Sequence, residues 1–129
     1  MDNNEKGFLG EQISTSYLIK NHYQIIAKNY RKKWGEIDIV AFDRKTKETV
    51  FVEVKSRLKK LKEDSSPSIL PEEELTEDKI KKLQRAILSF LNQYHLDDKP
   101  WRFDLLAIEI NDFNQEPEIR HYKDIYLEF

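Results

Sequence analysis

Residues 35–56 read GEIDIVAFDRKTKETVFVEVKS, and this stretch decides the fold. It holds two runs rich in β-branched and aromatic residues, 36–42 and 49–56, which are separated by the polar turn 43–48. Two such runs joined by a short polar connection are typical of a β-hairpin. We therefore expect two antiparallel strands here.

Three charged residues interrupt this apolar hairpin: Asp38, Glu53 and Lys55. A buried carboxylate needs a metal ion or another cation as partner, because an unpaired charge is costly to remove from water. Residues two apart in a strand project from one face, so Glu53 should lie beside Lys55. Asp38 joins them if its strand faces the same way. Glu36 has the parity of Asp38 and is a secondary candidate.

Two carboxylates and a lysine in this arrangement suit the hydrolysis of phosphodiesters. Mg²⁺ or Mn²⁺ held by carboxylate oxygens can neutralise the scissile phosphate and activate a water, while a lysine orients that water. The alternative is a solvated ladder of Glu53 and Lys55 on an exposed face. The same Glu-x-Lys spacing recurs from Glu77 to Lys79, so the triplet alone does not decide between these interpretations.

A helix is expected at residues 5–21, where apolar residues recur at helical spacing without a proline. Small side chains on one of its faces would let the helix lie close to a sheet, and Glu11 would then point inward. That face comprises Gly7, Glu11, Ser14 and Leu18.

A second helix should begin at Thr76, whose hydroxyl can cap it, and end near residue 95. Residues 32–35 are expected to form a basic turn in which Gly35 is free to take a positive φ. The polar segment at about 58–75 is expected to be a mobile surface loop. Further strands are expected at residues 23–30, 101–110 and 119–122, which predicts an α/β fold with a mixed central sheet of four to five strands flanked by helices.

The bulk properties limit the alternatives. A chain of 129 residues suits a single domain, residues 1–129, and the absence of cysteine excludes disulfides and thiolate metal sites. No apolar run is long enough to span a bilayer, so we expect a soluble, cytoplasmic protein without a membrane partner.

Charge is unevenly distributed, although the net charge is only −2. Residues 20–62 hold 13 Lys and Arg against 5 Asp and Glu, a local charge of +8. Such a patch can bind phosphates, or it can be one of two solvated faces of opposite sign. The candidates for contacts with nucleic acid are Arg31, Lys32, Lys33 and Arg57.

Three other kinds of side chain have simpler expected roles. Trp34 can cover the edge of the hairpin or stack on an unpaired base, and the first role is favoured. The histidines His22, His95 and His121 lack the spacing of a zinc site and are expected at the surface. Asp104 interrupts an apolar strand, so a structural ion pair with an arginine is its expected role.

Several spaced motifs lie between about residues 7 and 110: Gly10 with Glu11, Tyr17 with Leu18, Asn29 with Arg31, residues 35–40, residues 50–57, and Arg102 to Asp104. Together they resemble the bacterial YraN-like family, an uncharacterised family of predicted endonucleases distantly similar to archaeal Holliday-junction resolvases. The resemblance implies a restriction-endonuclease-like core. It also implies that Glu11, Asp38 and Glu53 are the metal-binding acids and that Lys55 is the catalytic lysine.

Sequence and resemblance together favour an endonuclease that depends on Mg²⁺ or Mn²⁺ and acts on DNA, with branched structures as candidate substrates. Resolvases of this fold act as dimers, so a homodimer is a candidate assembly. No residue pattern here identifies a dimer surface. The alternatives are a non-catalytic nucleic-acid-binding domain of the same fold and a protein-interaction domain whose acidic half docks a basic partner.

Overall fold

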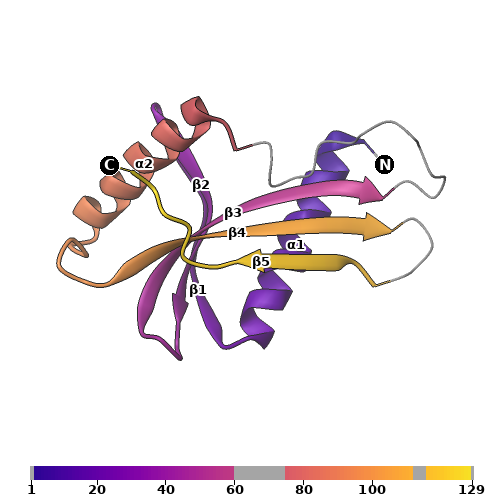
Figure 1. Cartoon of the computed structure of the whole chain (residues 1–129), viewed down its shortest axis with the longest axis horizontal. Helices are drawn as coiled ribbons and strands as arrows, with labels where there is room; N and C mark the ends of the chain where they lie inside the picture. Colours follow the sequence, from indigo (N-terminus) through magenta and orange to yellow (C-terminus); the bar gives the residue numbers. More distant parts are fainter. Residues whose placement is uncertain (1, 60–74, 112–115, 129) are drawn as a thin grey trace.

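The structure is a computed structural model that describes residues 2–59, 75–111 and 116–128. In these ranges the chain forms two helices and one five-stranded sheet (Figure 1). This confirms the predicted α/β fold. In chain order the elements are α1 (Asn3–Lys20), β1 (Tyr23–Lys32), β2 (Gly35–Asp43), β3 (Glu48–Lys59), α2 (Glu77–Gln93), β4 (Trp101–Asn111) and β5 (Glu118–Tyr122).

The strands lie in the sheet in the order in which they occur in the chain, β1-β2-β3-β4-β5. β1, β2 and β3 are antiparallel neighbours, β3 and β4 are parallel, and β5 returns antiparallel to β4. The predicted hairpin is therefore confirmed. β3 extends to Lys59, and the rest of the loop expected at 58–75 lies, apart from Leu75, outside the described residues.

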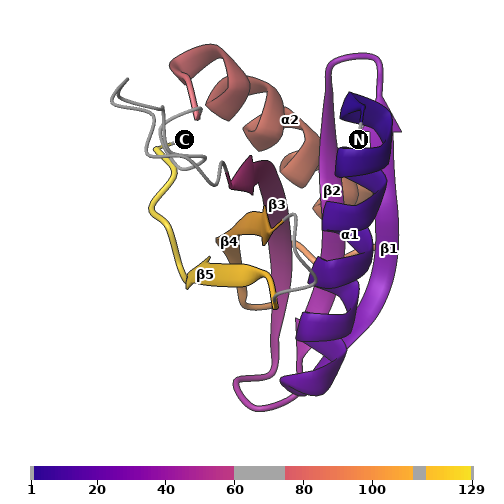
Figure 2. The same cartoon turned by 90° about the vertical axis from the view of Figure 1, so that its right-hand side faces the viewer.

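The helices cover opposite faces of the sheet (Figure 2). Leu18 of α1 packs with Ala41 and Val52 in one core, whereas Phe90 of α2 packs with Val40 and Phe51 in the other. Successive strand residues point to opposite faces, so β2 and β3 supply both cores. Within the described ranges, neither helix has the length and apolar character needed to cross a bilayer.

Two glycines let the helices approach the sheet closely. A Cβ on Gly10 would overlap the side chain of Ser56 on β3, and a Cβ on Gly35 would overlap the carbonyl oxygen of Lys82 on α2. Gly35 does not have a positive φ, so the turn does not use the conformational freedom of glycine, and the close approach of α2 is the reason for glycine there. Gly7, expected on the sheet-facing side of α1, instead has open space around it.

A buried polar network joins the ends of several elements. Asp104, which is fully buried, accepts hydrogen bonds from Arg102 Nε at 3.0 Å and from the backbone N–H of Asp124 at 2.9 Å. His121 Nε2 lies 2.7 Å from Asp104 Oδ2, and its Nδ1 lies 3.0 Å from the Tyr17 hydroxyl. The expected Asp104–arginine pair is confirmed, but the His121 side chain is only 6% exposed and belongs to this network, so it is not a solvated surface residue.

Candidate active site

The strands around Asp38 depart from regular pairing. The β2–β3 ladder ends at Ile39 opposite Val52. Asn29 and Asp38 are left out of the β1–β2 ladder although the pairs on either side of them keep one register, and the register shift of that ladder lies between Ile25 and Ala27. Asn29 has a φ of 50°, a left-handed conformation that asparagine tolerates better than most residues. On either side of Asp38, Ile37 and Ile39 consequently point into opposite cores. This irregularity places Asp38 where β2 and β3 part.

The carboxyl group of Asp38 bridges to β3 at this point. Its Oδ2 accepts the backbone N–H of Val54 at 2.8 Å, and the carboxyl groups of Asp38 and Glu53 are hydrogen-bonded to each other. Burial, followed by the charge of Asp38, raises the pKa of Glu53 to about 8. Burial also raises the pKa of Asp38. Burial and mutual repulsion therefore oppose the ionisation of both carboxyl groups at once.

Lys55 completes a compact group on β3. Its ammonium lies 3.7 Å from Glu53 Oε1, and the two side chains are only 19% and 18% exposed. The charge of Lys55 opposes the rise in pKa of both carboxyl groups. The structure thus brings Asp38, Glu53 and Lys55 together in a shielded position, which differs from a solvated ladder.

Glu11 lies on the other side of Asp38. Its Oε1 accepts a hydrogen bond from Asn29 Nδ2 at 3.0 Å, and it lines a pocket of about 430 Å³ together with Asp38 and Ser56. Glu53 lines a different pocket. Among the residues that the structure describes, no group of three or more acidic or histidine side chains is arranged to hold a metal ion.

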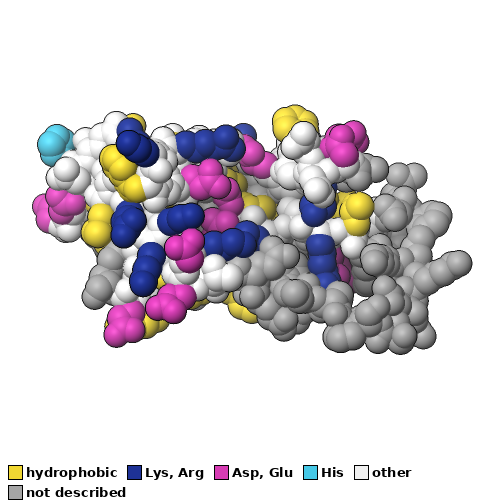
Figure 3. All heavy atoms as spheres, turned by 90° about the horizontal axis from the view of Figure 1, so that it is seen from above, with side chains coloured by type: hydrophobic (Ala, Val, Ile, Leu, Met, Phe, Trp, Pro, Cys, Tyr) yellow, Lys and Arg dark blue, Asp and Glu magenta, His cyan; other side chains and the backbone are white. Residues whose placement is uncertain are grey.

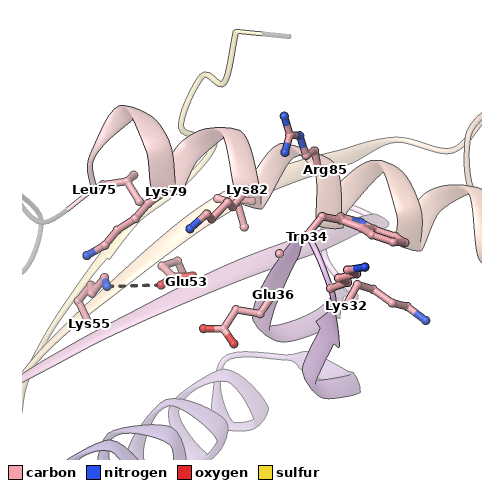
Figure 4. A pocket seen from close by; sticks show the side chains of 12 residues that line it. Lys32, Trp34, Glu36, Glu53, Lys55, Leu75, Lys79, Lys82 and Arg85 are labelled. Atoms are coloured by element: carbon pink, nitrogen blue, oxygen red, sulfur yellow. Dashed lines mark ion pairs between the residues drawn. The ribbon is translucent and has the colours of Figure 1, made fainter.

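An open pocket of about 680 Å³ lies in front of Glu53, between the sheet and α2 (Figure 4). Seen from above in Figure 3, Lys and Arg side chains gather around a hollow with acidic side chains among them. Six basic side chains and two acidic ones line this basic pocket, as we call it, and such an excess suits an anionic ligand. The basic members are Lys32, Lys33, Lys55, Lys79, Lys82 and Arg85, and the acidic ones are Glu36 and Glu53.

The four residues predicted to contact nucleic acid do not all line the same pocket. Lys32 and Lys33 line the basic pocket. Arg31 lines the pocket of Glu11 and forms a 3.5 Å ion pair with Glu36, in which both side chains are mostly exposed. Arg57 instead pairs with the buried Glu109 at 2.8 Å and lies outside both linings.

Three basic residues of α2 were missed by the sequence analysis. Lys79, Lys82 and Arg85 are spaced three apart, so they share one side of the helix, above Glu53. The signal existed in that spacing, beside the apolar stripe that begins at Ile80. It could not be used, because only the fold shows that this side of α2 faces the hairpin.

Comparison with known proteins identifies the family. The model of the uncharacterised protein family UPF0102 matches residues 10–108. A UPF0102 protein of Geotalea uraniireducens is 41% identical over 125 residues, which cover 97% of this chain and 91% of the relative. A second, of Sulfurihydrogenibium sp., is 38% identical over 111 residues, covering 86% of this chain and 90% of the relative. The chain belongs to the uncharacterised family UPF0102.

Proposed function

We propose that this protein is a divalent-metal-dependent endonuclease that hydrolyses DNA phosphodiesters. The observation that carries the proposal is the contact between the Asp38 and Glu53 carboxyl groups, with Lys55 3.7 Å from Glu53, at the edge of a pocket lined by six basic side chains. Carboxylates suit a hard cation, and the basic lining suits the phosphates on either side of the reacting one.

The donor set fits Mg²⁺ or Mn²⁺. Both cations prefer oxygen ligands, and Mg²⁺ is commonly bound by one or two carboxylates, with waters and substrate phosphates completing its shell. Two acidic side chains are therefore sufficient. The raised pKa of Glu53 supports this assignment, because the pKa stays high even with Lys55 beside the carboxyl group, and a bound cation would supply the further positive charge that lets both acids ionise.

Each residue has a defined role in this proposal. A bound cation would neutralise charge on the scissile phosphate and lower the pKa of a water. Asp38 and Glu53 would hold it, with the N–H of Val54 fixing the orientation of the Asp38 carboxylate. Lys55 would position the attacking water or stabilise the pentavalent transition state. Glu11, on the far side of Asp38, and Glu36, at the rim of the basic pocket, are proposed as outer groups.

The arrangement of the sheet is compatible with the restriction-endonuclease-like core that the sequence resemblance implies. The antiparallel β1–β3 unit is followed by a crossover through α2 to the parallel strand β4, and the acidic pair lies where β2 and β3 part. By the same resemblance, branched DNA is a candidate substrate and a homodimer a candidate assembly.

The test uses the full chain with labelled branched, flapped, single-stranded and duplex DNA, in Mg²⁺, Mn²⁺ or EDTA. We expect cleavage that needs the metal and falls at least about 100-fold in Asp38→Asn and Glu53→Gln. Lys55→Ala should also slow it. The control is Glu77→Gln, in the second Glu-x-Lys triplet, whose side chain is 88% exposed and outside the pocket lining. Cleavage that survives all three site substitutions would refute the proposal.

A titration with Mn²⁺ gives a readout that does not depend on activity. Wild-type protein should bind the ion, and both Asp38→Asn and Glu53→Gln should weaken binding, whereas Glu77→Gln should not. One observation favours the rival proposal of a non-catalytic nucleic-acid-binding domain, namely that the described residues bring only two carboxyl groups into contact at the site. DNA binding without Mn²⁺ binding and without cleavage would support that rival.

A further inference from the structure

Trp34 is an unusual side chain for its position. It lies in the two-residue turn between β1 and β2, and it is 46% exposed. Figure 4 shows its indole lying alongside α2 at one end of the basic pocket. On its other side Trp34 lines a shallow depression together with Arg85, Leu88 and Ser89. A large aromatic surface therefore connects the basic pocket with an open surface of α2.

Trp34 does not behave as a core residue. The second tryptophan, Trp101, packs edge-on against Phe51 with ring centroids 5.6 Å apart and borders the hydrophobic core of α2. Trp34 belongs to neither hydrophobic core, and within the described part of the chain no other ring stacks on it. Covering the edge of the hairpin, the role favoured from sequence, thus leaves much of the indole in water.

The charges around Trp34 are those that a nucleic-acid strand requires. Lys32 at the end of β1 and Lys33 in the turn precede it, and Lys82 and Arg85 lie on the facing side of α2. The 3.3 Å pair of Lys82 with Asp78 is highly exposed, with side chains 60% and 76% accessible, so it competes weakly with a phosphate. An exposed indole beside a basic groove is the combination by which proteins bind single strands: bases stack on the ring and phosphates meet the cations.

We propose that Trp34 is a stacking platform for an unpaired nucleotide whose neighbouring phosphates lie in the basic pocket. This inference rests on the proposed function, because the strand it describes is the one that would reach Glu53. Bases inside a duplex are already stacked and cannot reach the indole. The substrate class is accordingly DNA with a single-stranded segment beside the cleavage point, such as a flap, a fork or an overhang.

The experiment measures binding in EDTA with the Glu53→Gln protein, so that cleavage plays no part. Fluorescence anisotropy would compare a labelled single strand with a blunt duplex of the same length. Trp34→Ala should weaken binding of the single strand by about five-fold or more and change binding of the duplex less than about two-fold. Trp34→Phe should retain most of the affinity. The control is Tyr126→Ala, which removes an aromatic ring that is 83% exposed and outside the basic pocket.

Intrinsic fluorescence supplies a second readout, since the chain has two tryptophans. A single strand should quench the emission, and this quenching should be lost in Trp34→Phe and kept in Trp101→Phe. Equal losses of single-strand and duplex binding in Trp34→Ala, or unchanged quenching in Trp34→Phe, would overturn the inference. Failure of the nuclease proposal would look different, because it appears as an absence of cleavage and of Mn²⁺ binding whatever Trp34 does.

Discussion

At the scale of single residues, Glu53 carries a carboxyl group whose charged form is disfavoured in the folded protein. Burial and the neighbouring Asp38 raise the pKa of Glu53 from 4.5 to about 8. A carboxyl group whose pKa is higher in the folded state stabilises the fold below its unfolded pKa, and this contribution is lost as pH rises through the folded pKa. Without metal, the free energy of unfolding should therefore fall between about pH 5 and pH 9.

Substitution of this group tests the first prediction. In EDTA, Glu53→Gln should be more stable than wild type at pH 9, by about 2 to 4 kcal/mol, and close to wild type at pH 5. Urea unfolding followed by circular dichroism at several pH values measures the difference. Glu77→Gln, whose side chain is exposed, is the control and should give the wild-type profile. Parallel curves for wild type and Glu53→Gln would show that Glu53 ionises normally.

The second prediction concerns Gly35, the first residue of β2, where α2 packs directly against the strand. A methyl group there would overlap the backbone carbonyl of Lys82, which cannot rotate away as a side chain could. Gly35→Ala should therefore lower the unfolding free energy by about 1 to 3 kcal/mol. Gly7→Ala is the matched control: the exposed Gly7 has nothing within 4 Å, so alanine should leave stability unchanged or raise it by up to about 1 kcal/mol. Similar effects of both substitutions would contradict this account.

At the scale of elements, α2 carries an apolar and a basic stripe that adjoin. Leu83, Ile87 and Phe90 lie in the hydrophobic core, and Lys79 and Lys82 line the basic pocket, whose lining Leu83 also joins. The same helix therefore holds the sheet in place and forms one wall of the pocket.

The third prediction follows from this placement. The double variant Lys79→Ala, Lys82→Ala should bind DNA more weakly and with a salt dependence reduced by about one to two ion equivalents, because phosphate contacts release counterions. Anisotropy titrations between 50 and 200 mM salt, roughly the range over which such contacts dominate, measure this slope. Lys81→Ala is the control, since Lys81 pairs with Glu77 and lies outside the lining of the pocket. An unchanged slope in the double variant would show that Lys79 and Lys82 make no phosphate contacts.

Local patterns predicted most of the elements, because alternation and helical spacing reflect which faces are buried. The hairpin, the cap at Thr76 and the short edge strand β5 are examples, and each lies within a few residues of its expected bounds. The proximity of Glu53 and Lys55 also followed from strand parity alone.

The rest of the site depends on contacts between distant segments. Parity could not predict that the β2–β3 ladder ends before Asp38, nor that Glu11 and Glu53 would line different pockets. The place of Arg57 beside the proposed site and in the resemblance predicts a contact with nucleic acid, but its partner across the parallel strands, Glu109, lies 52 positions later in the chain. Contacts of this kind arise from the tertiary structure. Local sequence patterns carry no information about them.

At the scale of the whole molecule, a buried cation holds distant elements together. Arg102 on β4 donates to Asp104 and to the hydroxyl of Tyr23 on β1, at 3.0 and 2.8 Å. It also lies 3.0 Å from Asp43 at the end of β2, and both of these side chains are at most 5% exposed. Such a network is stable only while its carboxylates are ionised, because loss of one charge leaves the guanidinium under-compensated.

The fourth prediction is acid unfolding through this network. Although burial disfavours its charge, hydrogen bonds from the N–H of Lys45 and from Arg102 lower the pKa of Asp43 from 3.8 to about 2. A carboxyl group with a lowered folded pKa stabilises the fold above its unfolded pKa, and that contribution disappears as pH falls from about 4 to about 2. Asp43→Asn should thus cost about 2 kcal/mol at pH 7 and converge with wild type near pH 2.

Urea denaturation from pH 7 down to the acid limit measures both curves, with the exposed Asp97→Asn as a control that should follow wild type. A constant gap between Asp43→Asn and wild type at every pH would mean that the substitution disturbs packing or the turn, in which Asp43 also accepts the N–H of Lys45, rather than removing a charge. If the two curves converge at low pH, the stabilising effect of Asp43 comes from its charge, which pairs with Arg102 on a distant strand. Because Asp43 lies at the far end of β2 from Gly35, beyond Asp38, Asp43→Asn should leave the proposed binding of Mn²⁺ by Asp38 and Glu53 unchanged.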